Sequence, residues 1–112
     1  MPRPIDTDHL EKYVSGDISL RDEILTIFQD QIELLREKID PASDDETWHN
    51  TMHAMKGASR GVGAWEVGDL CEKAETLIEN FDNKQAARQE LIKELLVKLD
   101  ETIEDAKKLR DG

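Results

Sequence analysis

The chain contains very little cysteine and very few aromatic residues. Cys71 is the single cysteine among 112 residues, which excludes an internal disulfide and a cysteine-based zinc site and is typical of a reducing compartment. Aromatic residues make up only 4% of the sequence, so aliphatic side chains must form most of the core. Cys71 lies on an apolar stripe with Leu70 and Ala74 and has no adjacent base. We therefore expect a small core residue rather than a reactive thiol.

The sequence also lacks long apolar runs and an excess of positive charge. No run approaches the roughly 20 apolar residues of a membrane-spanning helix, and the segment from Met1 to Asp6 has no apolar core of the kind found in signal peptides. The formal net charge is -11, from 26 acidic and 15 basic residues, and such a surface repels nucleic-acid backbones and anionic lipids. We therefore expect a soluble cytoplasmic protein that binds neither nucleic acid nor membranes.

Apolar residues recur every three or four positions through most of the chain, and no segment alternates with the period of two that a strand requires. The pattern predicts one short helix, near Asp8–Val14, and four longer ones. The first of the longer helices begins at Ser19, where Asp22 completes a variant of the capping box, and ends at Asp40-Pro41. The second begins at Ser43 or Asp44 and ends near Arg60. The third carries apolar residues from Val67 to Phe81, and the last follows Asn83 and carries apolar residues from Leu91 to Ala106.

We predict an all-α fold in a single domain, residues 1–112. Helices of similar length joined by short loops favour an up-down-up-down antiparallel four-helix bundle, with the short N-terminal helix closing one end. The apolar residues that recur at helical spacing in the second predicted helix, and so form its apolar stripe, are Leu20, Ile24, Ile27, Phe28, Leu35 and Ile39.

The third predicted helix separates into an apolar face and a polar face at about 100° per residue. The apolar face carries Trp48, Met52, Met55, Ser59 and Val62, and the opposite face carries His49, His53, Lys56, Gly57 and Arg60. We therefore expect His53 to be exposed. A glycine inside an exposed helix costs about 1 kcal/mol relative to alanine, so Gly57 indicates a steric requirement: the surface of another protein can approach the imidazole.

An exposed imidazole is a good nucleophile near neutral pH. Lys56 and Arg60 lie on the same face as His53 and can stabilise negative charge on a group bonded to the ring, for which a phosphoryl group is the natural candidate. Phosphoryl transfer depends mainly on positioning and charge neutralisation, so a helix face can perform it if a partner supplies the remaining groups. From these residues alone, an ordinary solvated helix face is the alternative interpretation.

The stretch from Trp48 to Glu75 reads W-x4-H-x2-K-G-A-x4-G-A-x5-L-C-x2-A-E and resembles the histidine-containing phosphotransfer (HPt) domain. The central motif of that family, H-x-x-K-G, is matched by His53, Lys56 and Gly57. The resemblance implies that His53 accepts a phosphoryl group, that Lys56 stabilises it, and that Gly57 leaves room for a receiver domain. Members of the family carry phosphoryl groups between the aspartates of response-regulator receiver domains in multistep phosphorelays.

The resemblance further implies a monomeric carrier without autokinase activity, whose partners are response-regulator receiver domains and a hybrid histidine kinase. We expect no cofactor on this chain, and Mg²⁺ in the acidic pocket of the receiver, since no carboxylate cluster is apparent at His53. The residues that we expect at the partner surface are His49, Arg60 and Lys73. The residues of the fourth helix that could face His53, with roles left open, are Asp69, Glu72 and Lys73.

Two alternative functions remain possible for this sequence, whereas a zinc site is not expected. A histidine kinase usually has an acidic residue after its histidine, whereas Ala54 follows His53, and the chain has no glycine-rich phosphate loop. A dimeric phosphotransferase derived from a kinase is still possible, as is a non-catalytic helical adaptor. His49 and His53 are spaced to bind zinc, but no further ligand is apparent, so we expect no metal site.

Overall fold

The computed structural model describes residues 3–111; Met1 and Pro2, which begin the N-terminal segment discussed above, and Gly112 lie outside the described residues. Within that range the chain forms the helices α1 (Thr7–Val14), α2 (Ile18–Glu37), α3 (Asp45–Gly61), α4 (Trp65–Glu75) and α5 (Lys84–Asp111). Residues 3–111 contain no strand. No described helix combines the length and the apolar character needed to cross a membrane.

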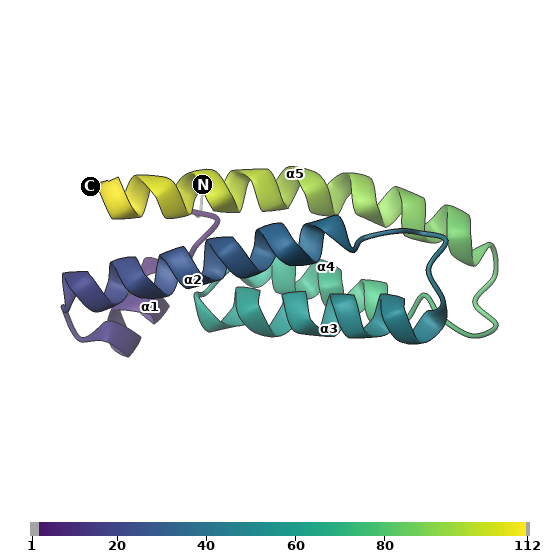
Figure 1. The fold of residues 1–112 in the computed structure, drawn as a ribbon, viewed down its shortest axis with the longest axis horizontal. Helices are drawn as coiled ribbons and strands as arrows, with labels where there is room; N and C mark the ends of the chain where they lie inside the picture. Colours follow the sequence, from purple (N-terminus) through teal and green to yellow (C-terminus); the bar gives the residue numbers. More distant parts are fainter. Residues whose placement is uncertain (1–2, 112) are drawn as a thin grey trace.

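Helices α2 to α5 form the predicted antiparallel bundle (Figure 1). Helix α3 packs against α2 and α4, and α5 packs against the same two helices, so α3 and α5 occupy opposite corners. Helix α1 packs against α2 at one end, as predicted. The outer face of α3 is therefore left uncovered by any other helix of the described chain.

An aspartate caps the N-terminus of each of the first three helices. The carboxylates of Asp6, Asp17 and Asp44 each accept hydrogen bonds from backbone N–H groups in the first turn, which stabilises a helix start. Asp44 is thus the cap chosen from the two predicted candidates. The predicted capping box at Ser19 and Asp22 is wrong, because Asp17 caps α2 and the helix begins one residue earlier. Helix α2 also ends at Glu37, before the proline that we expected to end it.

The main core contains the whole predicted apolar face of α3, since Trp48, Met52, Met55, Ser59 and Val62 are each at most 3% exposed. The prediction for α2 is partly wrong. Ile27 is 52% exposed and Leu20 is 37% exposed, whereas Leu25 and Ile32 are fully buried. The reason is α1, because Leu10 and Val14 bury Leu25 in a second, smaller core. The buried side of α2 is therefore shifted from the predicted stripe, of which Phe28 is buried and Ile24, Leu35 and Ile39 pack against the main core.

Helix α4 is much shorter than predicted. It ends at Glu75, has 11 residues against 28 in α5, and does not continue to Phe81, which is 46% exposed. Leu77 remains buried although it lies beyond the helix. The helical spacing of apolar residues continues past the end of α4 because Leu77, a loop residue, packs in the core. Glu75 therefore lies in the last turn of the helix.

The N-terminal segment holds the turn between α3 and α4 against the bundle. The Asp6 N–H donates to the Gly63 carbonyl at 2.9 Å, and the Ile5 N–H donates to the Asp105 carboxylate of α5. Gly63 has φ of 82°, and a Cβ there would lie 2.9 Å from the Asp6 carbonyl oxygen, so a glycine is required. This turn sets α4 beside the outer face of α3.

Candidate functional site

Three of the predicted site residues share the outer face of α3. The His53 side chain is 66% exposed, while the Lys56 side chain is only 17% exposed because it lies against α4. Gly57 is exposed, and a Cβ added there would meet nothing within 4 Å. The folded chain itself therefore gives no steric reason for this glycine, which leaves the space beside His53 open to another molecule.

The carboxylate of Glu75, at the end of α4, is the centre of the site. Lys56 Nζ lies 2.9 Å from Oε1 and donates a hydrogen bond to Oε2 at 3.1 Å. His53 Nδ1 lies 3.4 Å from Oε1, and His49 Nε2 lies 3.8 Å from Oε2. Burial raises the pKa of the Glu75 carboxyl, but the hydrogen bond and charge of Lys56, with His53, outweigh burial and lower the pKa overall. Glu75 is therefore an anion at neutral pH.

A carboxylate beside Nδ1 favours the imidazole tautomer that carries its proton on that nitrogen. In this tautomer the Nε2 lone pair of His53 is free. Because the ring is exposed, a reacting group on another molecule can reach this nitrogen. The site thus supplies a nucleophile, a carboxylate that orients it, and an ammonium group one helical turn away.

Arg60 is directed toward α4 and away from the His53 group. Its guanidinium lies 2.9 Å from Glu72 and 3.4 Å from Asp69. A Cβ on Gly68 would lie only 2.7 Å from Arg60 Cγ, so Gly68 allows the arginine to cross α4. Asp69 and Glu72, two of the residues left open above, are thus partners of Arg60 rather than of His53.

The remaining predicted residues have different positions. The His49 and His53 rings are nearly parallel, with 9° between their planes and 5.9 Å between their centroids. Lys73 is exposed and forms no salt bridge within residues 3–111. Glu75 was not predicted, although it ends the pattern that resembles the family and follows Cys71 by four residues. The fourth helix was predicted to extend further, so residues 69–73 were expected to face His53.

Cys71 is buried as predicted. Burial, followed by the charge of Glu75, raises the pKa of its thiol to about 12, which leaves it protonated and unreactive at neutral pH. Within residues 3–111 no group of three or more histidine, cysteine or acidic side chains is arranged to hold a metal ion.

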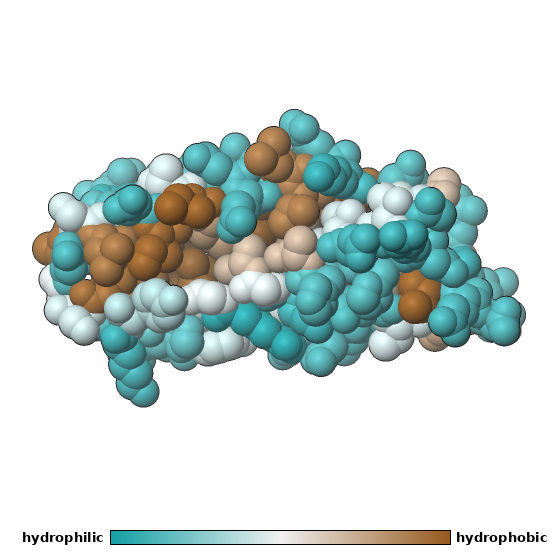
Figure 2. All heavy atoms as spheres, turned by 60° about the horizontal axis from the view of Figure 1, so that its bottom comes forward, coloured by the Kyte–Doolittle hydropathy of each residue, from teal (hydrophilic) through white to brown (hydrophobic). Residues whose placement is uncertain are grey.

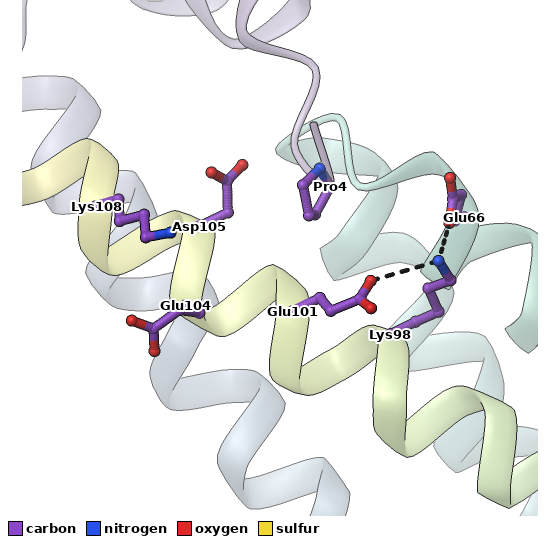
Figure 3. Close-up of a pocket in the computed structure, with 7 residues that line it drawn as sticks. All are labelled: Pro4, Glu66, Lys98, Glu101, Glu104, Asp105 and Lys108. Carbon is purple, nitrogen blue, oxygen red and sulfur yellow. Dashed lines mark hydrogen bonds and ion pairs between the residues drawn. The ribbon is translucent and has the colours of Figure 1, made fainter. Parts of the chain in front are cut away.

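A groove lies elsewhere, between the N-terminal segment, the start of α4 and the second half of α5 (Figure 3). Lys98 reaches between the carboxylates of Glu66 and Glu101, at 2.9 Å and 3.4 Å. Asp105 in the lining pairs with Arg3, and α3 contributes none of the lining. This groove therefore has no part in the chemistry of His53.

Comparisons with known proteins agree with this geometry. The profile of the Hpt domain family matches residues 19–108, which include all of α3 and α4. A similar solved structure is the crystal structure of the histidine phosphotransferase ShpA from Caulobacter crescentus, with 32% sequence identity, a TM-score of 0.60, and coverage of 94% of this chain and 96% of that chain. Among curated protein sequences none matches the chain. The chain belongs to the Hpt domain family.

Proposed function

We propose that this protein carries a phosphoryl group on His53 between aspartates of response-regulator receiver domains in a multistep phosphorelay. The observation that carries the proposal is the exposed His53 ring, with Nδ1 beside the Glu75 carboxylate and Lys56 bound to the same carboxylate. Membership of the Hpt domain family supports it. The similar structure from Caulobacter crescentus is itself a histidine phosphotransferase.

In the proposed step the Nε2 lone pair attacks the phosphorus of an aspartyl phosphate on the receiver. The new N–P bond forms as the P–O bond to the aspartate breaks, and the aspartate leaves as a carboxylate. The ring keeps its Nδ1 proton and becomes positively charged, and Glu75 stabilises that charge. Lys56 lies one turn from the nucleophile and stabilises the phosphoryl oxygens. Transfer to a second receiver is the reverse step.

The metal of this reaction belongs to the partner. Mg²⁺ is a hard cation that prefers several oxygen ligands, and the carboxylate nearest to His53 is occupied by Lys56. We therefore assign Mg²⁺ to the acidic pocket of the receiver. His49, Arg60 and Lys73 would surround the docked receiver on α3 and α4.

The test is transfer of labelled phosphate from a phosphorylated receiver domain to the purified protein. We expect the label on this chain to be stable in base and labile in acid, which is the behaviour of phosphohistidine rather than of a phosphoester. An acid-stable label would contradict the proposal. A protein that binds the receivers of its organism but takes phosphate from none of them would be a helical adaptor. Sedimentation separates the expected monomer from a kinase-derived dimer.

An apolar groove continues from the site and provides a docking surface for the receiver. It runs between α1, α2 and α3, and its lining includes Tyr13, Ile27, Gly57 and Gly61. Tyr13 is 70% exposed and Ile27 is 52% exposed. Figure 2 shows apolar side chains gathered on this side of the molecule, toward the end where α1 lies. Gly57 belongs both to the groove and to the site, so a receiver that reaches His53 would cover the groove.

Replacing Ile27 with lysine is expected to weaken binding of a receiver about tenfold, because it places a charge in an apolar contact. Folding should change little, since the side chain is half exposed. Titration calorimetry measures the affinity. Val97 lies on α5 and is 56% exposed, so Val97→Lys is the matched control and should bind normally. Equal loss in both variants would exclude this docking surface.

Replacing Gly57 with alanine is expected to have opposite effects on stability and on transfer. The free energy of unfolding should rise by about 1 kcal/mol, because alanine favours the helix and its Cβ meets nothing in the folded chain. Transfer from a receiver should slow several-fold, because the methyl group occupies the approach to His53. Denaturant unfolding and phosphotransfer rates measure the two effects. Phosphorylation by phosphoramidate, which is small, should be unchanged; a matching loss there would indicate a damaged site instead.

A further inference from the structure

The Glu75 carboxylate has three protonatable neighbours, of which only one carries a permanent charge. Lys56 is the permanent cation, while His53 and His49 lie 3.4 Å and 3.8 Å away as imidazoles. The Glu75 side chain is only 14% exposed. Its Oε1 is closed to solvent and accepts no well-aligned hydrogen bond, although Lys56 Nζ is close to it. A shielded carboxylate of this kind needs a cationic partner at all times.

Phosphorylation of His53 changes the demand on Lys56. A phosphoryl group brings close to two negative charges, and Lys56 is the ammonium nearest to it on the same face. When Lys56 turns toward the phosphoryl oxygens it leaves Oε2 of Glu75, to which it donates its hydrogen bond. The atom nearest to Oε2 on another protonatable side chain is then His49 Nε2. His53 Nδ1 faces the other oxygen, Oε1.

We propose that His49 is a positioning residue that takes up a proton when His53 is phosphorylated and replaces Lys56 as the cationic partner of Glu75. The proton comes from solvent, because the His49 side chain is 41% exposed. This inference rests on the proposed function, since it concerns the phosphorylated state of the same site. Because the loaded state then binds more protons than the unloaded state, retention of the phosphoryl group should fall as the pH rises.

The surroundings of His49 favour this exchange. The titratable and charged groups around it are Glu75 from α4 and, from its own helix, Asp45, Glu46, His53 and Lys56. Asp45 is already paired with Lys84 and Arg88, and Glu72 of α4 is paired with Arg60. In the loaded site the two phosphoryl charges are balanced by the charged His53 ring and by Lys56, so His49 responds to the Glu75 carboxylate that Lys56 has left, 3.8 Å from His49 Nε2. Through a water-like dielectric, this one negative charge raises the ratio of protonated to neutral imidazole about sixfold.

The experiment follows the histidine rings by NMR while His53 is phosphorylated with phosphoramidate, whose P–N bond breaks as the new N–P bond forms and ammonia leaves. At pH 7 we expect the ring signals of His49 to move toward the protonated form, with a change of about sixfold in the ratio of the two forms. His9 is the internal control, because it packs on Trp65 beyond the other end of α3 and should not respond.

A second variant tests the route through Glu75. In Glu75→Gln the carboxylate is gone, so the response of His49 should fall to less than about twofold. Phosphorylation of His53 without a response of His49, or an undiminished response in Glu75→Gln, would overturn this inference and leave the proposed function intact. Failure of His53 to accept phosphate at all would overturn both.

Discussion

A His53→Gln variant is expected to take up no phosphate from a phosphorylated receiver, a loss on the order of 10³-fold or more relative to the wild type. Glutamine is polar and of comparable reach, but its amide has no nucleophilic lone pair. The His53 side chain is 66% exposed, and the carboxylate beside it keeps Lys56 as a partner. The variant should therefore fold normally and still bind the receiver, so that only the chemical step is lost.

The matched control is His49→Gln, which removes the neighbouring imidazole of the same helix face. It should still take up phosphate on His53, because His49 contributes no atom to the new bond, while receiver affinity and retention of the phosphoryl group should fall. The measurement is acid-labile label on the chain after mixing with a phosphorylated receiver. Label that persists in His53→Gln and disappears in His49→Gln would assign the acceptor to the other histidine. Label that persists in both would place it on neither.

The site could be predicted from the sequence as far as α3 determines it. The helix has a strong apolar face built from Trp48, Met52 and Met55, so the opposite face is fixed once the helix forms. An aspartate at its start and glycines at its end mark its limits. These signals are local and agree with one another, which is why the exposure of His53 and Gly57 could be read without any knowledge of the neighbouring helices.

The parts that were missed depend on contacts between segments distant in the sequence. Leu25 and Ile27 are both apolar residues of α2, and only the packing of α1 decides that Leu25 is buried. Glu75 looks like an ordinary surface residue unless α4 is known to end there beside Lys56. Arg88 follows the same logic, since a charged residue in the first turns of a long polar helix is expected on the surface. Its side chain is 1% exposed.

Replacing Arg88 with leucine is expected to lower the free energy of unfolding by about 3–5 kcal/mol. The guanidinium donates to the carbonyl oxygens of Leu77, Pro41 and Ser43 and to the carboxylate of Asp45. It also lies 4.5 Å from the centroid of the Trp48 ring, an arrangement that adds a cation–π attraction. One side chain thus joins α5 to both loops at this end of the bundle and to the start of α3.

Leucine fills part of the same space but leaves three carbonyl groups and one carboxylate without this donor. The loss of stability follows from these unpaired groups, since each is costly when it stays buried. For a domain near 100 residues the melting temperature should fall by more than about 10 °C. Arg36→Leu is the control, because Arg36 is 33% exposed and pairs with exposed Asp100, and exposed ion pairs contribute about 0–1 kcal/mol. Denaturant unfolding of both variants measures the difference.

Phosphoramidate labelling of folded Arg88→Leu should match the wild type, because Arg88 contacts the opposite side of α3 from His53. A loss below about 1 kcal/mol would mean that water replaces the guanidinium and that the loops hold together without it.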